Sequence, residues 1–146
     1  MLFVTWRLYG SLPADFVARV RNNKEPPNIR FARAEAFLDK SDRGPLWLRM
    51  PKVAEQVEAV ILRGARDLRQ YRLWAYVVMP NHVHTLITPR MPMSRITEGI
   101  KGVSAYHANR LLGRTGESFC SGSRLITGFV MRRKKRRFGF ISRIIP

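Results

Sequence analysis

The sequence is poor in cysteine, and it has no acidic residue after Glu117. Its single cysteine, Cys120, excludes an internal disulfide and a cysteine-based zinc site, which fits a reducing compartment, so we expect a cytoplasmic protein. The longest stretch without charge, residues 73–89, is interrupted by Pro80, Asn81 and two histidines and is too polar to cross a membrane. The first residues lack the basic region and cleavage site of a signal peptide, and we expect a strand there.

A chain of 146 residues with 45% hydrophobic residues predicts a single domain with its own core. Lys and Arg total 27 against 10 acidic residues, a formal charge of +17. This charge argues against an enzyme for small neutral substrates and favours a polyanion, with nucleic acid as the first partner to test. Residues 120–146 hold eight basic and no acidic residues, including the run Arg132–Arg137, and are predicted to form a solvated tail.

The pattern of apolar residues, prolines and glycines predicts three strands and four helices. The expected strands cover residues 2–8, 72–79 and 82–88, and the expected helices cover residues 14–21, 30–38, 51–70 and 94–112. The second and third strands form a hairpin around Pro80-Asn81. The order β-α-α-α-β-β-α indicates an α+β domain with an antiparallel sheet.

The sharpest local motif is His82-Val83-His84, on the second strand of that hairpin. Alternate residues of a strand face the same side about 7 Å apart, so both imidazoles can face one divalent ion while Val83 packs on the other side. The alternative is that the two histidines are ordinary polar surface residues, because a motif match alone is only a hypothesis.

Several segments resemble one family in the family's own order. They are Phe3–Pro13, Trp74–His84, Ile100–Arg110 and Gly113–Glu117. These segments are similar to the bacterial tyrosine transposases associated with repetitive extragenic palindromes, which are single-tyrosine HUH transposases. The resemblance implies a ferredoxin-like domain in which His82 and His84 hold Mg²⁺ or Mn²⁺. It also implies that a tyrosine of a C-terminal helix attacks a phosphate of a single-stranded DNA hairpin.

The resemblance ends at Phe119, and the family's tyrosine is missing. The residues Cys120–Arg124 are what Trp-Gln-Arg-Glu-Ser becomes when its codons lose one G, and Ile141–Pro146 is a one-base displacement of the family's Tyr-Ile-Glu-Asn-Asn-Pro. We therefore interpret residues 1–119 as a transposase-like domain that is incomplete at its C-terminal end. Residues 120–146 would be a frameshifted, poorly ordered basic tail in which Ile141 occupies the place of the nucleophile, which predicts an inactive copy.

Other polar residues are given structural roles. Tyr106 is a weak substitute nucleophile, and we expect it to be a packing or stacking aromatic residue. Tyr76 is expected in the core, His107 on the surface, and Asn81 in the hairpin turn without binding a metal. Two imidazoles alone bind a hard ion weakly, and with the C-terminal helix missing we expect low metal occupancy.

DNA contact is expected to survive better than catalysis. The candidate phosphate contacts are Arg7, Arg49, Arg63, Arg66, Arg69, Arg72, Arg90, Arg95, Lys101, Arg110 and Arg114, and the candidate stacking residues are Trp6, Trp47, Trp74 and Tyr106. The alternatives are that these arginines only solubilise the protein and that the tryptophans lie in the core.

Two other functional interpretations stay open. One is a non-catalytic protein that binds single-stranded DNA or RNA hairpins, and the other is an unstable product of a degenerate gene whose bare apolar surface aggregates. Neither interpretation includes a membrane or a small-molecule substrate, and the sequence leaves the oligomeric state open.

Overall fold

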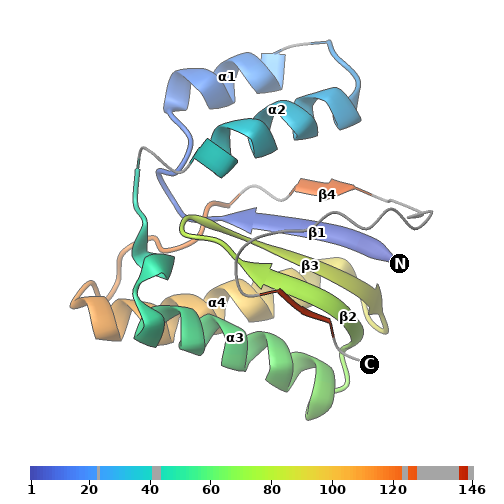
Figure 1. Ribbon diagram of the computed structural model, residues 1–146, viewed down its shortest axis with the longest axis vertical. Helices are drawn as coiled ribbons and strands as arrows, with labels where there is room; N and C mark the ends of the chain where they lie inside the picture. Colours follow the sequence, from blue (N-terminus) through green and yellow to red (C-terminus); the bar gives the residue numbers. More distant parts are fainter. Residues whose placement is uncertain (23, 41–43, 123–124, 128–141, 145–146) are drawn as a thin grey trace.

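The computed structural model describes residues 1–22, 24–40, 44–122, 125–127 and 142–144. Its centre is an antiparallel sheet in the order β4-β1-β3-β2-β5 (Figure 1). The strands are β1 (Leu2–Arg7), β2 (Tyr71–Val78), β3 (His82–Pro89), β4 (Leu125–Thr127) and β5 (Ser142–Ile144). The order β4-β1-β3-β2 is that of a ferredoxin-like sheet, and β5 adds a further edge, so the predicted α+β fold is confirmed.

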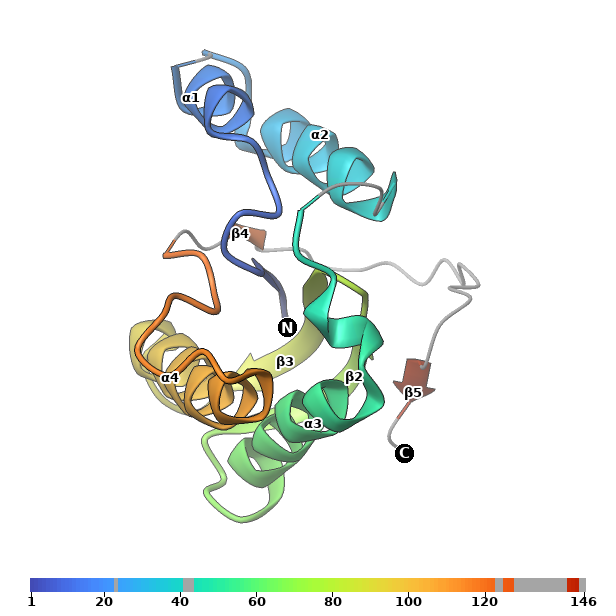
Figure 2. The same ribbon diagram turned by 90° about the vertical axis from the view of Figure 1, so that its left-hand side faces the viewer.

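Helices lie on both sides of this sheet. They are α1 (Ala14–Asn22), α2 (Pro27–Lys40), the short 3₁₀ helix η1 (Trp47–Arg49), α3 (Pro51–Arg66) and α4 (Met93–Leu112). Figure 2 shows α3 and α4 together on one face of the sheet, and α1 and α2 beyond the opposite face. Within the described segments, every helix is too short or too polar to span a membrane.

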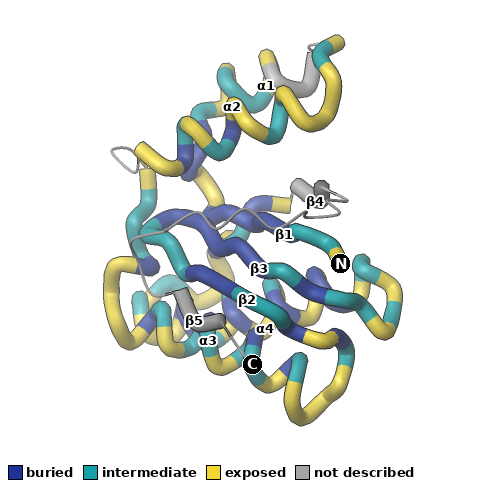
Figure 3. Tube along the Cα trace, turned by 45° about the vertical axis from the view of Figure 1, so that its right-hand side comes forward, coloured by how far each residue is buried: buried dark blue, intermediate teal, exposed yellow. Residues whose placement is uncertain are grey.

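The main core lies between the sheet and the α3–α4 layer. Val83 and Ile87 of β3 are about 1% exposed, and they pack in one cluster with Ile61 of α3 and with Ile96 and Ile100 of α4. Figure 3 shows how the buried residues continue along β1 and β3, the two central strands. Burying side chains of this size stabilises the fold by about 1.5–3 kcal/mol each, so this cluster fixes β3 in the middle of the domain.

Helix α3 ends earlier than the sequence pattern predicts. Its apolar residues recur at helical spacing, but the expected end at Gln70 is wrong, because the helix ends at Arg66. Arg69 has a φ of 49°, in the left-handed region that a helix cannot contain. This early end lets the chain turn directly into β2, where the hydroxyl of Tyr71 donates a hydrogen bond to the carbonyl of Ile61.

A second, smaller core holds α1 and α2 together. Leu38 and Ala34 of α2 pack with Leu12, and the rings of Phe16 and Phe37 lie 4.9 Å apart. None of these residues belongs to the main core cluster. The two helices therefore form a unit with its own apolar contacts, placed over the sheet face that α3 and α4 leave open.

The basic tail is described only at two short segments. β4 pairs with Phe3–Thr5 of β1, and β5 pairs with Ala75–Val77 of β2. The run Arg132–Arg137 lies outside the described residues, so the poorly ordered tail and the division of the chain at residue 119 stay predictions. Cys120, the first residue of the tail, forms an isolated bridge with Leu8, and burial raises the pKa of its thiol to about 11.

Gly64 offers a test of the packing between α3 and β2. A Cβ atom at this position would lie 2.5 Å from the hydroxyl oxygen of Tyr71 and 2.9 Å from its ring. Because the Tyr71 side chain is buried, we expect Gly64→Ala to lower the free energy of unfolding by about 1–3 kcal/mol in urea titrations followed by circular dichroism.

The matched control is Gly99→Ala in α4, where the added methyl group would have no atom within 4 Å apart from its chain neighbours and the backbone of its own helix. This change removes the helix penalty of glycine and is expected to raise the stability by about 0.5–1 kcal/mol. Equal urea midpoints for the two variants would contradict the packing described here.

Candidate metal centre

The alternation of side chains along β3 separates the site from the core. Val83 faces the α3–α4 layer, so His82 and His84 face the opposite side, beneath α2. The strand is central: His84 lies across from Thr5 of β1 on one side and from Val77 of β2 on the other. Both histidines are therefore held by a fully paired backbone, which gives their side chains fixed directions.

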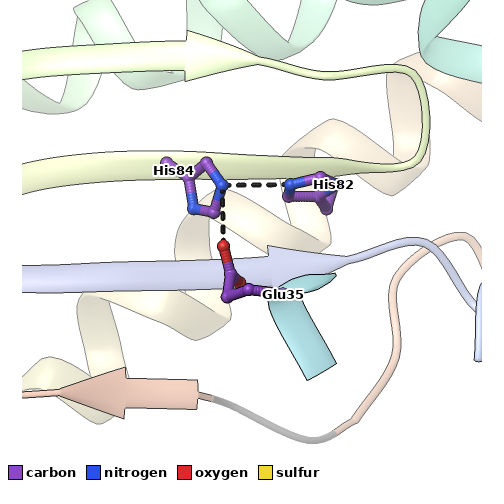
Figure 4. A group of neighbouring side chains, drawn as sticks. All are labelled: Glu35, His82 and His84. Carbon is purple, nitrogen blue, oxygen red and sulfur yellow. Dashed lines mark hydrogen bonds and ion pairs between the residues drawn. The ribbon is translucent and has the colours of Figure 1, made fainter. Parts of the chain in front are cut away.

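Three ligand atoms converge on this face of the sheet. Nε2 of His82 and Nε2 of His84 lie 3.0 Å apart, and Oε2 of Glu35, from α2, lies 3.0 Å from Nε2 of His84 (Figure 4). All three residues have a ligand atom within 4.8 Å of the others. The other carboxylate oxygen of Glu35, Oε1, is buried and has no hydrogen-bond partner among the described residues. An unpaired buried carboxylate oxygen is costly and needs a donor or a cation.

The other nitrogen of each imidazole is held by a neutral oxygen. Nδ1 of His82 lies 2.6 Å from Oδ1 of Asn81, and Nδ1 of His84 lies 2.8 Å from the hydroxyl of Thr5. The amide nitrogen of Asn81 donates to the carbonyl of Leu38, which turns Oδ1 toward His82. Because Oδ1 only accepts, Nδ1 of His82 carries the proton and Nε2 presents its lone pair to the site. This is the outer contact that usually orients a metal-binding histidine.

Burial keeps His82 neutral. Its side chain is 0% exposed, and desolvation, with a smaller effect of His84, lowers its pKa from 6.5 to about 3. The neutral imidazole is the form that binds metals. Because Nε2 of His82 carries a lone pair, its contact with Nε2 of His84 requires a hydrogen on the His84 nitrogen. Nε2 of His82 and Oε2 of Glu35 are then two acceptors around this one hydrogen. A cation at this place would displace that proton.

Aromatic rings and a second carboxylate border the site. The ring of Phe3 stacks on His84 with centroids 5.1 Å apart, and Phe31 of α2 meets Phe3 edge-on. Oδ1 of Asp39 lies 3.7 Å from Nε2 of His82, and burial, together with the charge of Glu35, raises the pKa of Asp39. The site is thus closed on the β1 side by apolar rings and has a second acidic group at its rim.

The predicted residues do not all meet here. His82 and His84 come together as the spacing predicts, whereas Tyr106 lies on α4, across the sheet from them, and is 58% exposed. Ile141 lies outside the described residues. Sequence reasoning missed Glu35 and treated Asn81 as a turn residue. The only sequence signal for Glu35 is that this acidic residue stands next to Ala34, which belongs to the apolar side of the helix that the structure shows to be buried.

The candidate DNA-contacting residues fall into two groups. Trp6 is part of the core at 5% exposure, so it cannot offer its ring to a base. The other three aromatic candidates each have an arginine guanidinium over the ring: Arg72 over Trp74 at 4.1 Å, Arg114 over Trp47 at 4.0 Å, and Arg110 over Tyr106 at 5.5 Å. Arg7, on β1 opposite His82, is buried, and this burial lowers its pKa.

Asn81 offers a test of the geometry around His82. Asn81→Ala leaves Nδ1 of His82 and the carbonyl of Leu38 without these partners, so we expect a loss of about 1–3 kcal/mol in the free energy of unfolding, measured by urea titration in the presence of EDTA. The control, Asn28→Ala, changes an exposed asparagine of α2 and is expected to shift stability by less than about 0.5 kcal/mol. An effect of Asn81→Ala as small as that of the control would show that Asn81 does not hold His82.

Comparison with known proteins agrees with this geometry. A family profile described as "Transposase IS200 like" matches residues 47–131, more than half of the chain. The match includes the β2–β3 hairpin with His82 and His84, whereas Glu35 precedes it. A search of curated proteins found no match. The hairpin, its two inward-facing histidines and the extent of the profile match lead to one assignment: the chain belongs to the family of IS200-like transposases.

Proposed function

We propose that this transposase domain is of the single-tyrosine HUH class associated with repetitive extragenic palindromes, and that it binds a phosphate of a single-stranded DNA hairpin at a divalent cation. The cation, Mg²⁺ or Mn²⁺, would be held by His82, His84 and Glu35. The convergence of two Nε2 atoms and one carboxylate oxygen carries this proposal. When bound, such an ion acts as a Lewis acid that polarises the phosphate.

The donor set fits a divalent ion better than the histidine pair alone. Two imidazoles favour softer metals, whereas Mg²⁺ and Mn²⁺ prefer oxygen ligands. Glu35 supplies an oxygen at 3.0 Å from His84, and its unpaired Oε1 supplies a second. Low metal occupancy was expected because two imidazoles alone bind a hard ion weakly. The Glu35 carboxylate would supply the missing third ligand.

The chain's own residues prepare the site for a charged ligand. Asn81 and Thr5 hold the two rings so that their Nε2 atoms face inward. Burial of His82 excludes water around the ligands and strengthens every electrostatic contact made there. Arg7, on the same face of β1 as Thr5, adds a positive charge beside His82.

We further propose that this copy binds DNA without cutting it. Of its four tyrosines, Tyr71 and Tyr76 lie in the core, and Tyr106 lies across the sheet from the histidines. The fourth, Tyr9, is exposed and makes no contact with His82, His84 or Glu35 among the described residues. The family's nucleophile corresponds to Ile141 by resemblance, and a one-base deletion at the Cys120 codon explains its loss. The profile match runs to residue 131 in the present reading frame, past Phe119, where the resemblance of the segments ends. The proposed frameshift therefore depends on finding Tyr-Ile-Glu-Asn-Asn-Pro in the gene read in the alternative frame after Phe119, and its absence there would contradict the proposal.

The proposed metal centre is tested by Mn²⁺ binding, measured by calorimetry on the full chain. We expect one ion per chain, and we expect Glu35→Gln to weaken binding at least about tenfold, because among the described residues its carboxylate lies nearest to the histidine pair, at 3.0 Å. The matched control is Asp39→Asn on the same helix, whose carboxylate is 56% exposed and 3.7 Å from His82, and whose effect is expected to be smaller. Equal affinities of wild type and Glu35→Gln would remove Glu35 from the site.

The loss of cleavage is tested with a labelled single-stranded hairpin, Mn²⁺ and a denaturing gel. We expect the protein to bind the hairpin but to leave no covalent adduct, because no described tyrosine side chain contacts the metal centre. The matched comparison is a chain made from the gene with one base restored at the Cys120 codon, which is expected to form the adduct.

An adduct with the unrepaired chain would contradict the inactive copy. Tyr9→Phe and Tyr106→Phe, which change the two exposed tyrosines, would then identify the nucleophile. Hairpin binding that is equally strong with EDTA would instead favour the metal-independent nucleic-acid-binding protein.

A further inference from the structure

A pocket of about 170 Å³ lies at the end of the β2–β3 hairpin that is remote from His82. Three arginines line it, Arg66, Arg72 and Arg90, and its floor includes the apolar side chains of Leu62 and Leu73. We name it the arginine pocket after its three cationic residues. A concave site with an apolar floor and several converging cations is suited to an anionic ligand with a nonpolar part.

Three different elements bring these arginines together. Arg66 is the last residue of α3, Arg72 is the second residue of β2, and Arg90 follows directly after β3. Backbone hydrogen bonds of Gln70 connect the three elements. Its backbone amide donates to the carbonyl of Gly64, and its backbone carbonyl accepts from the amide of Arg90, both at 2.9 Å. The backbone at the pocket is therefore fixed, and only the arginine side chains are free to adjust.

The positive charge of the pocket is not neutralised within the described part of the chain. All three arginines are exposed, and none forms an ion pair with a described carboxylate. Three like charges around one small pocket repel one another, so a bound anion lowers the electrostatic energy. The planar guanidinium group is also the side chain best suited to phosphate.

An aromatic ring lies next to this charge. The guanidinium of Arg72 lies 4.1 Å from the centre of the Trp74 ring, and the indole nitrogen of Trp74 donates to Thr88 at 2.9 Å. Trp74 is half-buried, and this hydrogen bond fixes its ring. Arginine stacked on an indole makes a flat, cationic platform, the combination that proteins use for the bases and phosphates of single strands.

This platform and the metal centre share one face of the sheet. Thr88 and His84 are both even-numbered residues of β3, so both side chains face the side opposite Val83. Four residues of a strand span about 13 Å. At the spacing of about 3.4 Å per nucleotide that one strand has in stacked duplex DNA, this distance corresponds to at most about four nucleotides, and to fewer of an extended single strand.

We infer that Trp74 and the arginine pocket form a second subsite for the single-stranded DNA that the metal centre binds. A base would stack on the Arg72–Trp74 pair on the histidine face. The strand would then pass around the end of β2 at Arg72, so that a neighbouring phosphate enters the pocket between Arg66 and Arg90, which Leu62 and Leu73 place on the α3 side of the sheet. This subsite rests on the proposed function, and it assigns the β2–β3 hairpin two tasks at its two ends. One end holds the phosphate at the cation, and the other holds the strand at most about four nucleotides away.

The test is binding of a labelled hairpin with single-stranded extensions on both sides, followed by fluorescence anisotropy at several salt concentrations. We expect Arg72→Ala to weaken binding roughly tenfold and to reduce the salt dependence by about 0.7 in log–log slope, the value for one lost contact to a single-strand phosphate. Trp74→Leu is expected to weaken binding to a similar degree without changing the slope, because stacking releases no counterion.

The matched control is Lys52→Ala. Lys52 is an exposed cationic residue of the same helix as Arg66, is not among the candidate phosphate contacts and does not line the pocket, so its removal costs the same charge without the contact. Circular dichroism and Mn²⁺ binding of each variant show that the fold and the metal centre are intact. Wild-type binding with equal affinities of Arg72→Ala and Lys52→Ala would overturn the subsite and leave the proposed function standing. No hairpin binding by the wild type would overturn both.

Discussion

The alternation of side chains on one central strand, β3, determines both the stability and the chemistry of this domain. Val83 and Ile87 pack the sheet against α3 and α4, whereas His82 and His84, on either side of Val83, face the opposite side. A shift of one residue in the pairing of β3 would bury the imidazoles in the main core and expose the apolar residues. The packing that stabilises the fold therefore also fixes the face of the sheet on which the two imidazoles lie.

The parts that sequence reasoning predicted are those governed by local patterns. The hairpin around Pro80-Asn81 and the shared face of the two histidines follow from period-two alternation, and the family resemblance adds the order of the strands. Glu35 could not be predicted in the same way, because its approach to His84 depends on how α2 packs over a sheet whose relevant strand is 47 residues further along the chain. The position of Trp6 in the core likewise depends on which face of β1 meets the helices, which its composition alone leaves undetermined.

The two short edge strands are the contribution of the tail to the sheet. β4 lies beside β1 and completes the ferredoxin-like order, and β5 extends the sheet beyond β2. Strand pairing uses backbone amides and carbonyls, so it tolerates a change of side chains that would destroy a buried helix or a catalytic residue. A shift of reading frame in this region, as we propose, would thus remove chemistry more completely than it removes the sheet.

The separate small core of α1 and α2 places Glu35 on a different structural unit from the two histidines. Contacts such as the one between Phe16 and Phe37 determine how the two helices pack, and Glu35 moves with that unit, while the main core under β3 is independent of it. The α1–α2 pair is therefore a separate packing unit within the domain. Substitutions at its apolar contacts would change the position of Glu35 while leaving the main core cluster unchanged.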